Sequence, residues 1–530
     1  MADSSLFERT PLVMRSTLPL RAGQLRARNL PAIPRDPIPV VCIEGAVRIA
    51  SFMGEQETSQ RVNARLAELL AMQQDDGSWP FSRNEALCVA RASWQAYLWQ
   101  GDRRCLAAVN TFLAWVATNY DSLITDPDLQ RHPADLIELA VDFYRHTGTP
   151  GSLRLLAKLR RDAWDWSVRL RTFDQTRPVD PDDKTLTDEL KETLRADSLA
   201  DGLRGVQKMS EYSGNGTEAQ TGELAWPKIR RWHGAICGGV TGSPLLGGAS
   251  SAAPIDPEVF GTWAEVISAC AASGEIWAAE EAEKLYVNTM PVASAGYVFS
   301  VNQLPAEGNE KSKKPSDLCT GRLLRGISAL LASSLLRLPN GFRLLYAAPI
   351  TCGLNINGHR VTIAVREEKN AWVLKMQPDA PLEFTAEIRV PAWADNAKVT
   401  ISGGTTVPCE AGKVFSRKQT WNPGDEIRLD FDPVLQVVSA RHQGRCVYVG
   451  PRLMALPLPA DHWAYALESA WIENGEVKAR MHPVREWKLR DGQPVDVPVL
   501  PETEEKTVEC VFVPFAETKA RIALFAGCDL

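Results

Sequence analysis

The stretch LIELAVDFYRHTG, residues 136–148, decides the fold class of the first part of the chain. Its apolar residues recur at the spacing of one face of an amphipathic helix, and Gly148 supplies the stop signal that such helices favour. Similar stretches follow one another from about residue 57 to residue 337, joined by short polar turns. Consecutive helices on short turns pack as antiparallel hairpins. Because no fixed-length repeat stands out, the pattern predicts a closed toroid of helices and not an open array.

The period of the apolar residues changes to two after about residue 340. FTAEIRVPAW (384–393) and EIRLDF (426–431) are typical of the strands that this alternation predicts, and NG, GG and PGD turns separate them. Short strands at this spacing indicate an antiparallel sandwich. We therefore expect a multidomain protein, α then β, with an N-terminal arm over residues 1–45, a helical domain over 46–338, a β-sandwich over 339–455 and a β-rich segment over 456–530.

The overall composition excludes several classes of function. The chain has 530 residues with a formal net charge of −6, so it offers no strongly basic surface to hold a nucleic acid. Its 11 cysteines are scattered singly without a CxxC pair, which is typical of reduced thiols and not of a disulfide framework. Neither a signal-peptide core nor a membrane-spanning run stands out. We expect a cytoplasmic protein without nucleic-acid or membrane partners.

Three segments of the β half carry a family resemblance. IRVPAWADNAKVTISGG (388–404), WNPGDEIRLDFDP (421–433) and VYVGPRLMALPL (447–458) occur in an order that resembles the beta-L-arabinofuranosidase family, glycoside hydrolase family 127. In the helical half, CGGVTGS (237–243) and EVFGTW (258–263) also follow the family's order, and the resemblance covers roughly residues 60 to 525. It implies an (α/α)6 six-hairpin barrel followed by antiparallel β-sandwich domains, with glycosides hydrolysed at the open end of the barrel.

The family's zinc site is incomplete in this chain. Well-studied members hold zinc through one glutamate and three cysteines, and one thiolate is thought to be the nucleophile. Glu258 keeps the glutamate, but Phe260 replaces the first cysteine, and the adjacent cysteine pair falls on Leu318 and Cys319. Two ligands are fewer than the three or four that zinc takes in proteins. The sequence therefore predicts no cofactor.

A glycosidase without this zinc-bound thiolate would most simply use two carboxylates, one held protonated by burial and one ionised. Glu258 is the first candidate, because the resemblance places its helix start in the pocket; the alternative is a glutamate that stabilises the helix dipole. Asp135 takes the place of a family pocket histidine. Glu283 is retained from the family. Cys319 begins a helix, whose dipole would lower its thiol pKa, although inert burial is the commoner role of cysteine.

Four further residues are candidates for substrate binding. Asp197 lies on a predicted acidic helix face, and Asn302 falls in the family's order. His233 and Arg231 flank a glycine-rich turn, where a guanidinium could hold a carboxylate or sulfate of a sugar. Solvated helix faces and ends are the alternative for all of these charges.

Three functions remain open from the sequence. The first is a glycoside hydrolase acting on a small or oligomeric carbohydrate. The second is a lyase that eliminates across an acidic sugar, with Arg230, Arg231 and Lys313 as the neutralising cations. The third is a non-catalytic carbohydrate-binding relative that has lost its site. A homodimer is left open as the assembly.

Overall fold

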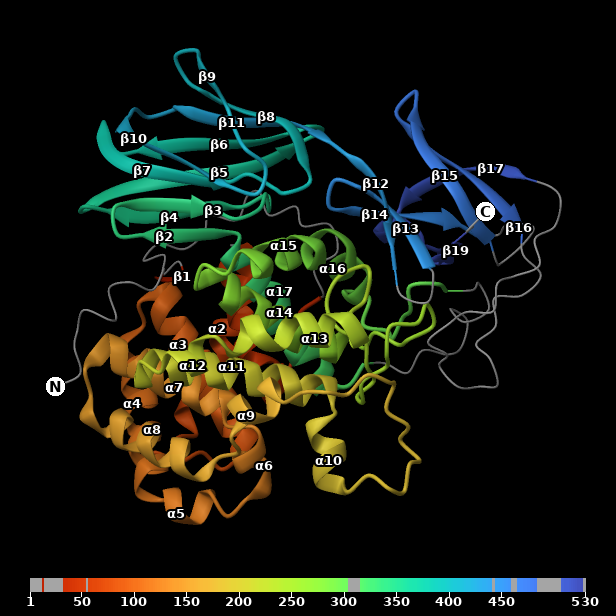
Figure 1. Cartoon of the computed structure of the whole chain (residues 1–530). Coiled ribbons are helices and arrows are strands. Elements are labelled where there is room, and N and C mark those ends of the chain that lie inside the picture. Colours follow the sequence, from red (N-terminus) through yellow and green to blue (C-terminus); the bar gives the residue numbers. More distant parts are fainter. Residues whose placement is uncertain are drawn as a thin grey trace.

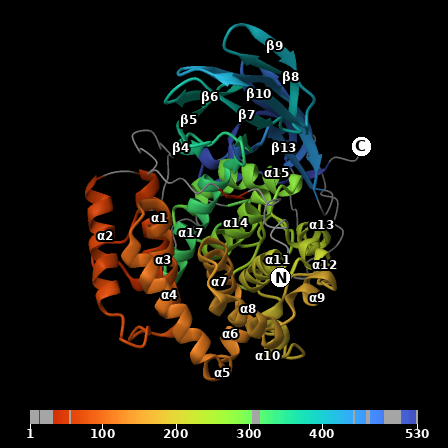
Figure 2. The same cartoon turned by 90° about the vertical axis from the view of Figure 1, so that its left-hand side faces the viewer.

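A computed structural model describes residues 12–13, 32–53, 56–303, 315–440, 444–458, 465–483 and 507–527. Helices form the lower part of the molecule in Figure 1, and the strands lie above them. The view in Figure 2 shows the same layering from the side. The predicted order, helices first and strands second, is confirmed. No helix in the described ranges is both long enough and apolar enough to cross a bilayer.

Six helices of the described chain neighbour one another in a closed ring. In ring order, each contacting the next and the last contacting the first, they are α1 (Ile43–Met53), α3 (Arg83–Gln100), α7 (Ala134–Thr147), α11 (Ala196–Ser213), α14 (Pro257–Ala272) and α17 (Asp317–Ser333). We call these the ring helices. Because α1 begins at Ile43, the helical domain starts inside the expected arm and not at residue 46.

The longer remaining helices pack on the outside of their ring neighbours. They are α2 (Gln56–Ala71) on α1, α4 (Arg103–Thr118) on α3, α8 (Pro150–Asp162) on α7, α13 (Thr221–His233) on α11 and α15 (Ile276–Lys284) on α14. Shorter elements connect them: α5 (Tyr120–Leu123), α6 (Pro127–Arg131), α9 (Trp166–Arg171), α10 (Asp188–Thr193), α12 (Gly216–Ala219), α16 (Met290–Ala293), the 3-10 helix Val40–Cys42 and the π-helix Leu285–Thr289. The outer helices leave only the inner faces of the ring helices to form a site.

Local sequence signals fix where the ring helices begin and end. Asp256 caps α14 by accepting a hydrogen bond from the Glu258 N–H at 2.9 Å, and Pro257 occupies the first helical position, where its missing N–H costs nothing. Ser316 caps α17 by accepting from the Cys319 N–H at 3.0 Å. Gly148 ends α7 in the left-handed conformation, as predicted. The caps hold Glu258 and Cys319 in first helical turns.

Charged side chains line the inside of the ring, and every ring helix supplies at least one of them. We call this set the axial cluster; it comprises Glu44, Arg48, Arg91, Asp135, Glu138, Asp197, Asp201, Arg204, Glu258, Glu265, Arg322 and Arg325. Its ion pairs join different helices: Arg91 reaches Glu44 and Glu138, both at 2.8 Å, and Arg325 reaches Glu265 at 2.9 Å. Buried charges are tolerated only when they are paired in this way.

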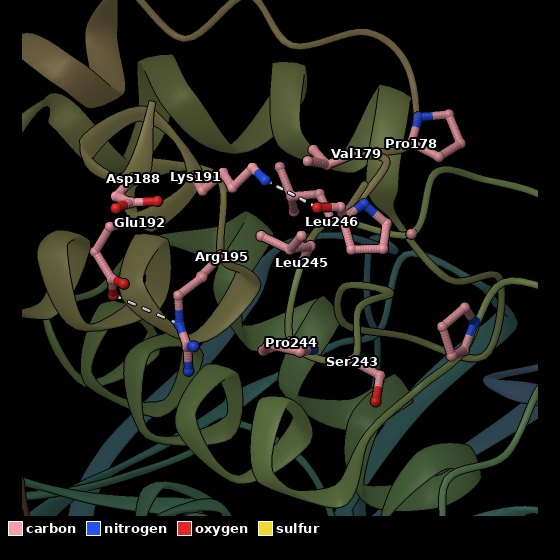
Figure 3. Close-up of a pocket in the computed structure, with 13 residues that line it drawn as sticks. Pro178, Val179, Asp188, Lys191, Glu192, Arg195, Ser243, Pro244, Leu245 and Leu246 are labelled. Atoms are coloured by element: carbon pink, nitrogen blue, oxygen red, sulfur yellow. Dashed lines mark hydrogen bonds and ion pairs between the residues drawn. The ribbon is translucent and has the colours of Figure 1, made fainter. Parts of the chain in front are cut away.

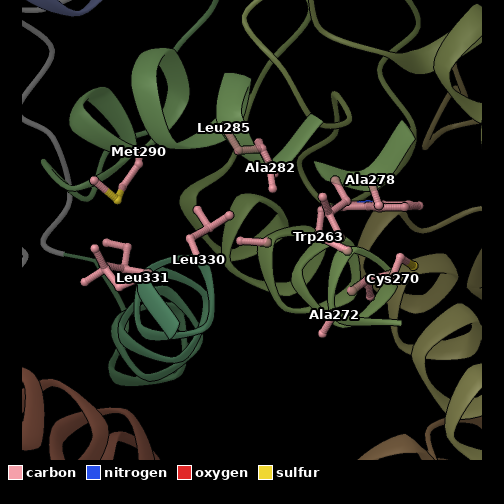
Figure 4. Packing of buried hydrophobic residues seen from close by; sticks show 14 of the residues in the cluster. Trp263, Cys270, Ala272, Ala278, Ala282, Leu285, Met290, Leu330 and Leu331 are labelled. Carbon is pink, nitrogen blue, oxygen red and sulfur yellow. The ribbon is translucent and has the colours of Figure 1, made fainter. Parts of the chain in front are cut away.

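The closest approach between ring helices is the crossing of α14 and α17. A Cβ added to Gly326 would lie 2.4 Å from the Gly261 carbonyl oxygen, so the two backbones touch where both residues lack side chains. Beside this crossing, Trp263, Leu330 and Ala278 of α15 belong to one buried cluster (Figure 4). The contact holds Glu258 on α14 next to Arg322 on α17.

Two sheets form the sandwich that follows the helices. The first has the order β1 (Leu12–Val13), β2 (Leu335–Leu338), β3 (Gly341–Leu344), β7 (Leu382–Arg389), β10 (Val414–Trp421), and the second has the order β4 (Thr351–Ile356), β5 (His359–Glu368), β6 (Ala371–Pro378), β11 (Glu426–Pro433), β8 (Ala394–Ile401), β9 (Thr405–Pro408). The pairing of β3 with β7 is parallel, against the expectation of a purely antiparallel sheet. The strands between them cross over through the other sheet, and such a crossover is what parallel pairing requires. Buried residues of the sandwich and of the helical domain form one continuous core.

The C-terminal strands form a separate unit with its own core. The strands β12 (Leu435–Ser439), β13 (Gly444–Val449), β14 (Arg452–Pro457), β15 (Tyr465–Glu473), β16 (Glu476–Pro483), β17 (Val508–Pro514), β18 (Arg521–Ile522) and β19 (Phe525–Gly527) share one sheet. Six of these strands pair in a closed circuit, in the order β13, β19, β15, β16, β17, β14 and back to β13. The segment that was expected to complete or add a sandwich is therefore part of a small barrel. The expected boundary at residue 455 is also wrong, because β12 and β13 already belong to this sheet. Closure removes edges that an open sheet would expose.

Substituting Gly326 with alanine tests the helix crossing. The added methyl group meets backbone atoms that cannot rotate away, so we expect the free energy of unfolding to fall by about 1–3 kcal/mol. Equilibrium denaturation of Gly326→Ala measures this loss. Gly151→Ala on α8 is the control, because its added Cβ approaches no atom more closely than 4.0 Å. Equal stability of the two variants would show that the crossing is not tight.

Substituting Arg325 with methionine tests the axial cluster. The change removes one of the cations that neutralise Asp135 and Glu265 in the ring interior, and we expect it to cost about 3–5 kcal/mol of unfolding free energy. Lys418→Met is the control, because it breaks the exposed pair with Glu383 and should have little effect on the same denaturation midpoint. A stable Arg325→Met protein would contradict a structural role for the cluster.

Candidate active site

Glu258 lies at the N-terminal end of α14 and faces the ring interior. Its Oε1 atom is 3.2 Å from Nη1 of Arg322 on α17, and 24% of its side chain is accessible. Burial raises the pKa of this carboxyl group; Arg322 opposes the increase but does not cancel it, and Asp197 adds to it. Glu258 is therefore a carboxyl group that keeps its proton to higher pH than an ordinary glutamate.

Arg322 is held in place by Asp197 of α11. The carboxylate of Asp197 is 2.9 Å from Arg322 and 2.8 Å from Arg195, and only 5% of its side chain is accessible. Burial would raise the pKa of Asp197, but Arg322 and Arg195 lower it overall. Asp197, predicted to bind substrate, is thus committed to positioning the arginine beside Glu258.

Asp135 faces the same interior from the first turn of α7. Its carboxylate accepts from Arg204 at 2.5 Å and from Arg325 at 2.7 Å, and it lies 3.1 Å from Arg91. Burial would raise its pKa, but Arg325, Arg91 and Arg204 outweigh burial and hold the pKa well below its usual range. Solvent still reaches 24% of the side chain. The pKa of Asp135 is thus shifted in the direction opposite to that of Glu258.

Cys319 is a buried thiol in the first turn of α17. Burial raises its pKa to about 12, and the charges of Asp256 and Glu258 add to the increase. The expected lowering by the helix dipole is therefore outweighed, and the unliganded thiol is protonated at neutral pH. Cys42 lies in the same region, where its Sγ donates to the Asp317 carbonyl oxygen at 3.1 Å.

The residues around Cys319 do not fit the zinc site of the resemblance. Phe260 is buried in the core and Leu318 is 46% exposed, so neither position offers a ligand. No group of three or more histidine, cysteine, aspartate or glutamate side chains in the described chain is arranged to hold a metal ion. Glu258 and Cys319 are what remains of the four-ligand set.

The other predicted residues lie apart from Glu258. Glu283 accepts from Arg389 at 2.6 Å and from the Trp393 indole at 3.2 Å, so it joins α15 to the sandwich. His233 is fully buried between the Gln175 carbonyl and the Gly248 N–H. Asn302 is bonded to the backbone of Ala523 and Leu524, and Arg231 is an exposed side chain over the Trp232 ring. All four residues therefore contact parts of the protein outside the ring interior, and none of these contacts involves Glu258.

A cavity of about 630 Å³ adjoins the N-terminal ends of α11 and α14 (Figure 3). Its lining comes from the segment before α11 and from the turn after Gly242: Pro178, Val179, Pro181, Asp188, Lys191, Glu192, Arg195, Ser243, Pro244, Leu245, Leu246, Gly247 and Pro254. Arg195 joins it to Asp197, and the Ser243 hydroxyl lies 3.0 Å from Asp256, the cap of α14. The cavity therefore shares two polar contacts with the surroundings of Glu258.

The sequence reasoning missed the arginines of the site. Arg91, Arg322 and Arg325 each stand inside a helix that is otherwise largely apolar, and this is the signal that could have found them. A buried arginine requires a carboxylate partner, so such positions predict an internal ion-pair cluster. The partner of each arginine depends on which helices are neighbours.

The chain can now be compared with known proteins. Residues 350–433 match the family described as Beta-L-arabinofuranosidase, GH127 middle domain. A search of curated proteins finds no match. Solved structures match over most of the chain: a glycoside hydrolase (TM-score 0.68, 14% identity, 92% of this chain and 91% of that one) and Ara127N-Se, a GH127 beta-L-arabinofuranosidase from Geobacillus stearothermophilus T6 (TM-score 0.63, 16% identity, 92% and 89%).

A third structure, the GH127 beta-arabinofuranosidase BT3674, matches with a TM-score of 0.62 and 14% identity, covering 92% of this chain and 87% of that one. The resemblance predicted from the ordered motifs is confirmed. Residues 350–433 match the GH127 middle-domain family, and the chain as a whole, at low sequence identity, has a fold similar to that of the solved GH127 arabinofuranosidases.

Proposed function

We propose that the protein is a glycoside hydrolase whose active site is the N-terminal end of the ring interior. The observation that carries the proposal is that two carboxyl groups have pKa values shifted in opposite directions. The pKa of Glu258 is raised and that of Asp135 is lowered. Carboxyl pairs with pKa values pushed apart are the acid and base arrangement of glycosidases. In this proposal the ring helices are the inner layer of an (α/α)6 six-hairpin barrel.

Each carboxyl group has a distinct role in the proposed reaction. Glu258 donates its proton to the glycosidic oxygen as the bond to the leaving group breaks. Arg322, 3.2 Å away, then stabilises the carboxylate that remains. Asp135, whose pKa is held low, supplies the negative charge opposite a sugar that becomes positively charged in the transition state. A water molecule then bonds to the anomeric carbon and gives a proton to the Glu258 carboxylate, which restores the acid. Arg204 and Arg325 keep Asp135 ionised and fix its position.

The proposed reaction does not use a zinc-bound thiolate. Two of the four ligand positions carry Phe260 and Leu318, and the Cys319 thiol has a pKa of about 12. A thiol with that pKa is a poor nucleophile at neutral pH, because the thiolate is the reactive form. The carboxylates of the axial cluster are the remaining candidates for the chemistry.

The substrate is proposed to be a small or oligomeric carbohydrate. Two of the structural neighbours are named for beta-L-arabinofuranosidase and beta-arabinofuranosidase activity, so arabinofuranosides come first in a substrate panel. A cytoplasmic location and a homodimer remain predictions from the sequence.

The two alternatives differ in the residues that they need. The lyase hypothesis uses Arg230 and Arg231, which the structure places on the exposed side of α13, and Lys313, which lies outside the described residues. The non-catalytic hypothesis predicts binding of a glycan without turnover. The same panel of glycosides separates both alternatives from hydrolysis. A lyase would release an unsaturated uronide, whereas a relative without activity would bind a glycan and leave it intact.

Substituting Glu258 with glutamine tests the proposed acid. We expect kcat/KM to fall by about 10²–10⁴-fold on substrates with poor leaving groups such as alkyl alcohols, because these need protonation as they depart. The loss should be far smaller on a 2,4-dinitrophenyl glycoside, whose leaving group needs no proton. Glu223→Gln, an exposed first-turn glutamate of α13, is the control and should retain the wild-type rate on both. Equal loss on both substrates would exclude Glu258 as the acid.

The pH profile gives an independent test of the same group. The proton of Glu258 is required, so activity on alkyl glycosides should decline as the pH rises through its raised pKa. The basic limb of the kcat/KM profile should be present only for the wild type with alkyl glycosides, and it should be absent for Glu258→Gln with the same substrates. Persistence of that limb in the variant would assign it to another group.

Metal analysis tests the zinc-independent proposal. We expect purified protein to contain zinc well below one atom per chain, and activity to survive both chelation and the Cys319→Ala substitution. Elemental analysis and rates after chelation are the measurements. Stoichiometric zinc, or loss of activity on chelation, would restore the family's zinc chemistry.

A further inference from the structure

The cavity beside α11 and α14 is linked to Glu258 by two short series of polar contacts. A general acid acts on the oxygen between the sugar and its leaving group, so the leaving group must extend from a point close to Glu258. Ser243, on the cavity wall, contacts Asp256 at 3.0 Å, and Asp256 accepts from the Glu258 N–H at 2.9 Å. On a second route, Arg195 contacts Asp197, which contacts Arg322, the partner of Glu258.

The wall of the cavity is largely apolar. Val179, Leu245 and Leu246 line it together with four prolines, and these side chains appear around the space in Figure 3. None of its lining residues, all of which are described, is aromatic. Sugar rings usually stack on aromatic side chains in their binding sites, whereas alkyl and other apolar groups need only aliphatic contact. The wall suits an apolar group better than a second sugar.

Three of the four charged residues that line the cavity have polar partners within the protein, and the fourth is Asp188, an exposed residue in the first turn of α10. Lys191 donates to the Pro181 carbonyl oxygen at 2.8 Å. Glu192 accepts from the Ser198 hydroxyl at 2.8 Å and lies 3.0 Å from His132 Nε2. Arg195 is bound to Asp197 at 2.8 Å. These contacts hold Lys191, Glu192 and Arg195 to protein partners, so the apolar part of the wall is left for a neutral ligand.

We propose that this cavity binds a neutral, apolar leaving group, so that the preferred substrates are glycosides of apolar alcohols and not oligosaccharides. The inference rests on the proposed glycosidase function. The volume of about 630 Å³ is within the range of small-molecule sites and exceeds what a methyl group needs. A longer apolar group therefore gains contact area with each added methylene.

An alkyl series tests the cavity at constant chemistry. Methyl, butyl and octyl glycosides of the sugar identified by the panel have leaving groups of similar acidity, so differences in rate report contact with the leaving group. We expect kcat/KM to rise by about two- to fourfold per methylene over the first members of the series. A flat series, or a disaccharide substrate better than the octyl glycoside, would overturn the proposal.

Filling the cavity gives the matched variants. Leu245→Trp places a larger side chain in the wall, and we expect it to abolish the increase of kcat/KM with chain length. Pro181→Trp, at an exposed rim position, is a second variant with less effect on folding, and it should reduce the same increase. Leu224→Trp, on an exposed leucine of α13 outside the cavity, is the control and should keep the wild-type slope. An unchanged slope in both cavity variants would overturn the proposal.

Equilibrium binding separates this inference from the proposed function. Fluorescence titration with 2-naphthol should give saturable binding that octanol displaces and that Leu245→Trp weakens at least tenfold. Such binding without hydrolysis of any glycoside would support the cavity and contradict the glycosidase function. The opposite result has two parts. The protein would hydrolyse alkyl glycosides at rates independent of chain length, and 2-naphthol would either not bind or bind equally well to Leu245→Trp. That result would support the function and overturn the cavity proposal.

Discussion

The pairing of arginines with carboxylates inside the helix ring is the interaction on which the rest of the molecule depends. Each ring helix contributes at least one charge, and the pairs run between helices, as from Arg91 to Glu44 and from Arg325 to Asp135. A single helix cannot satisfy these groups, and an unpaired buried charge is very costly. The pairing therefore favours one mutual arrangement of the ring helices, and it holds Glu258 to α17 through Arg322 and Asp135 to α17 through Arg325.

The same pairing gives the two carboxyl groups different chemistry. Asp135 contacts three arginines, which outweigh the effect of burial, whereas Glu258 contacts Arg322 alone and burial prevails. The difference arises from the number of guanidinium groups within reach, because both residues lie in first helical turns. It supports the proposed carboxylate mechanism in a chain that carries Phe260 and Leu318 where the resemblance predicts two zinc ligands.

Several features were predictable because they depend on local sequence. Gly148 ends α7 and Pro257 begins α14 as the patterns indicate, and the change from helical to alternating periodicity marks the transition to strands. The boundary near residue 455 was wrong, because the alternation of β12 and β13 does not say which sheet they join. Glu283 was predicted as a site residue because the resemblance retains it. In the structure it pairs with Arg389, more than 100 positions later in the chain, and the local sequence does not reveal this partner.

The sequence by itself determined the order of helices and strands and the helix ends, because periodicity and caps are local properties. Only the tertiary structure decided which carboxyl group has a raised pKa and which has a lowered one. A pKa is set by desolvation and by charges from other helices, and neither can be read along one chain segment. The tertiary structure also decided that Asp197 positions Arg322 and that the cavity wall meets the cap of α14, since these contacts join residues distant in sequence.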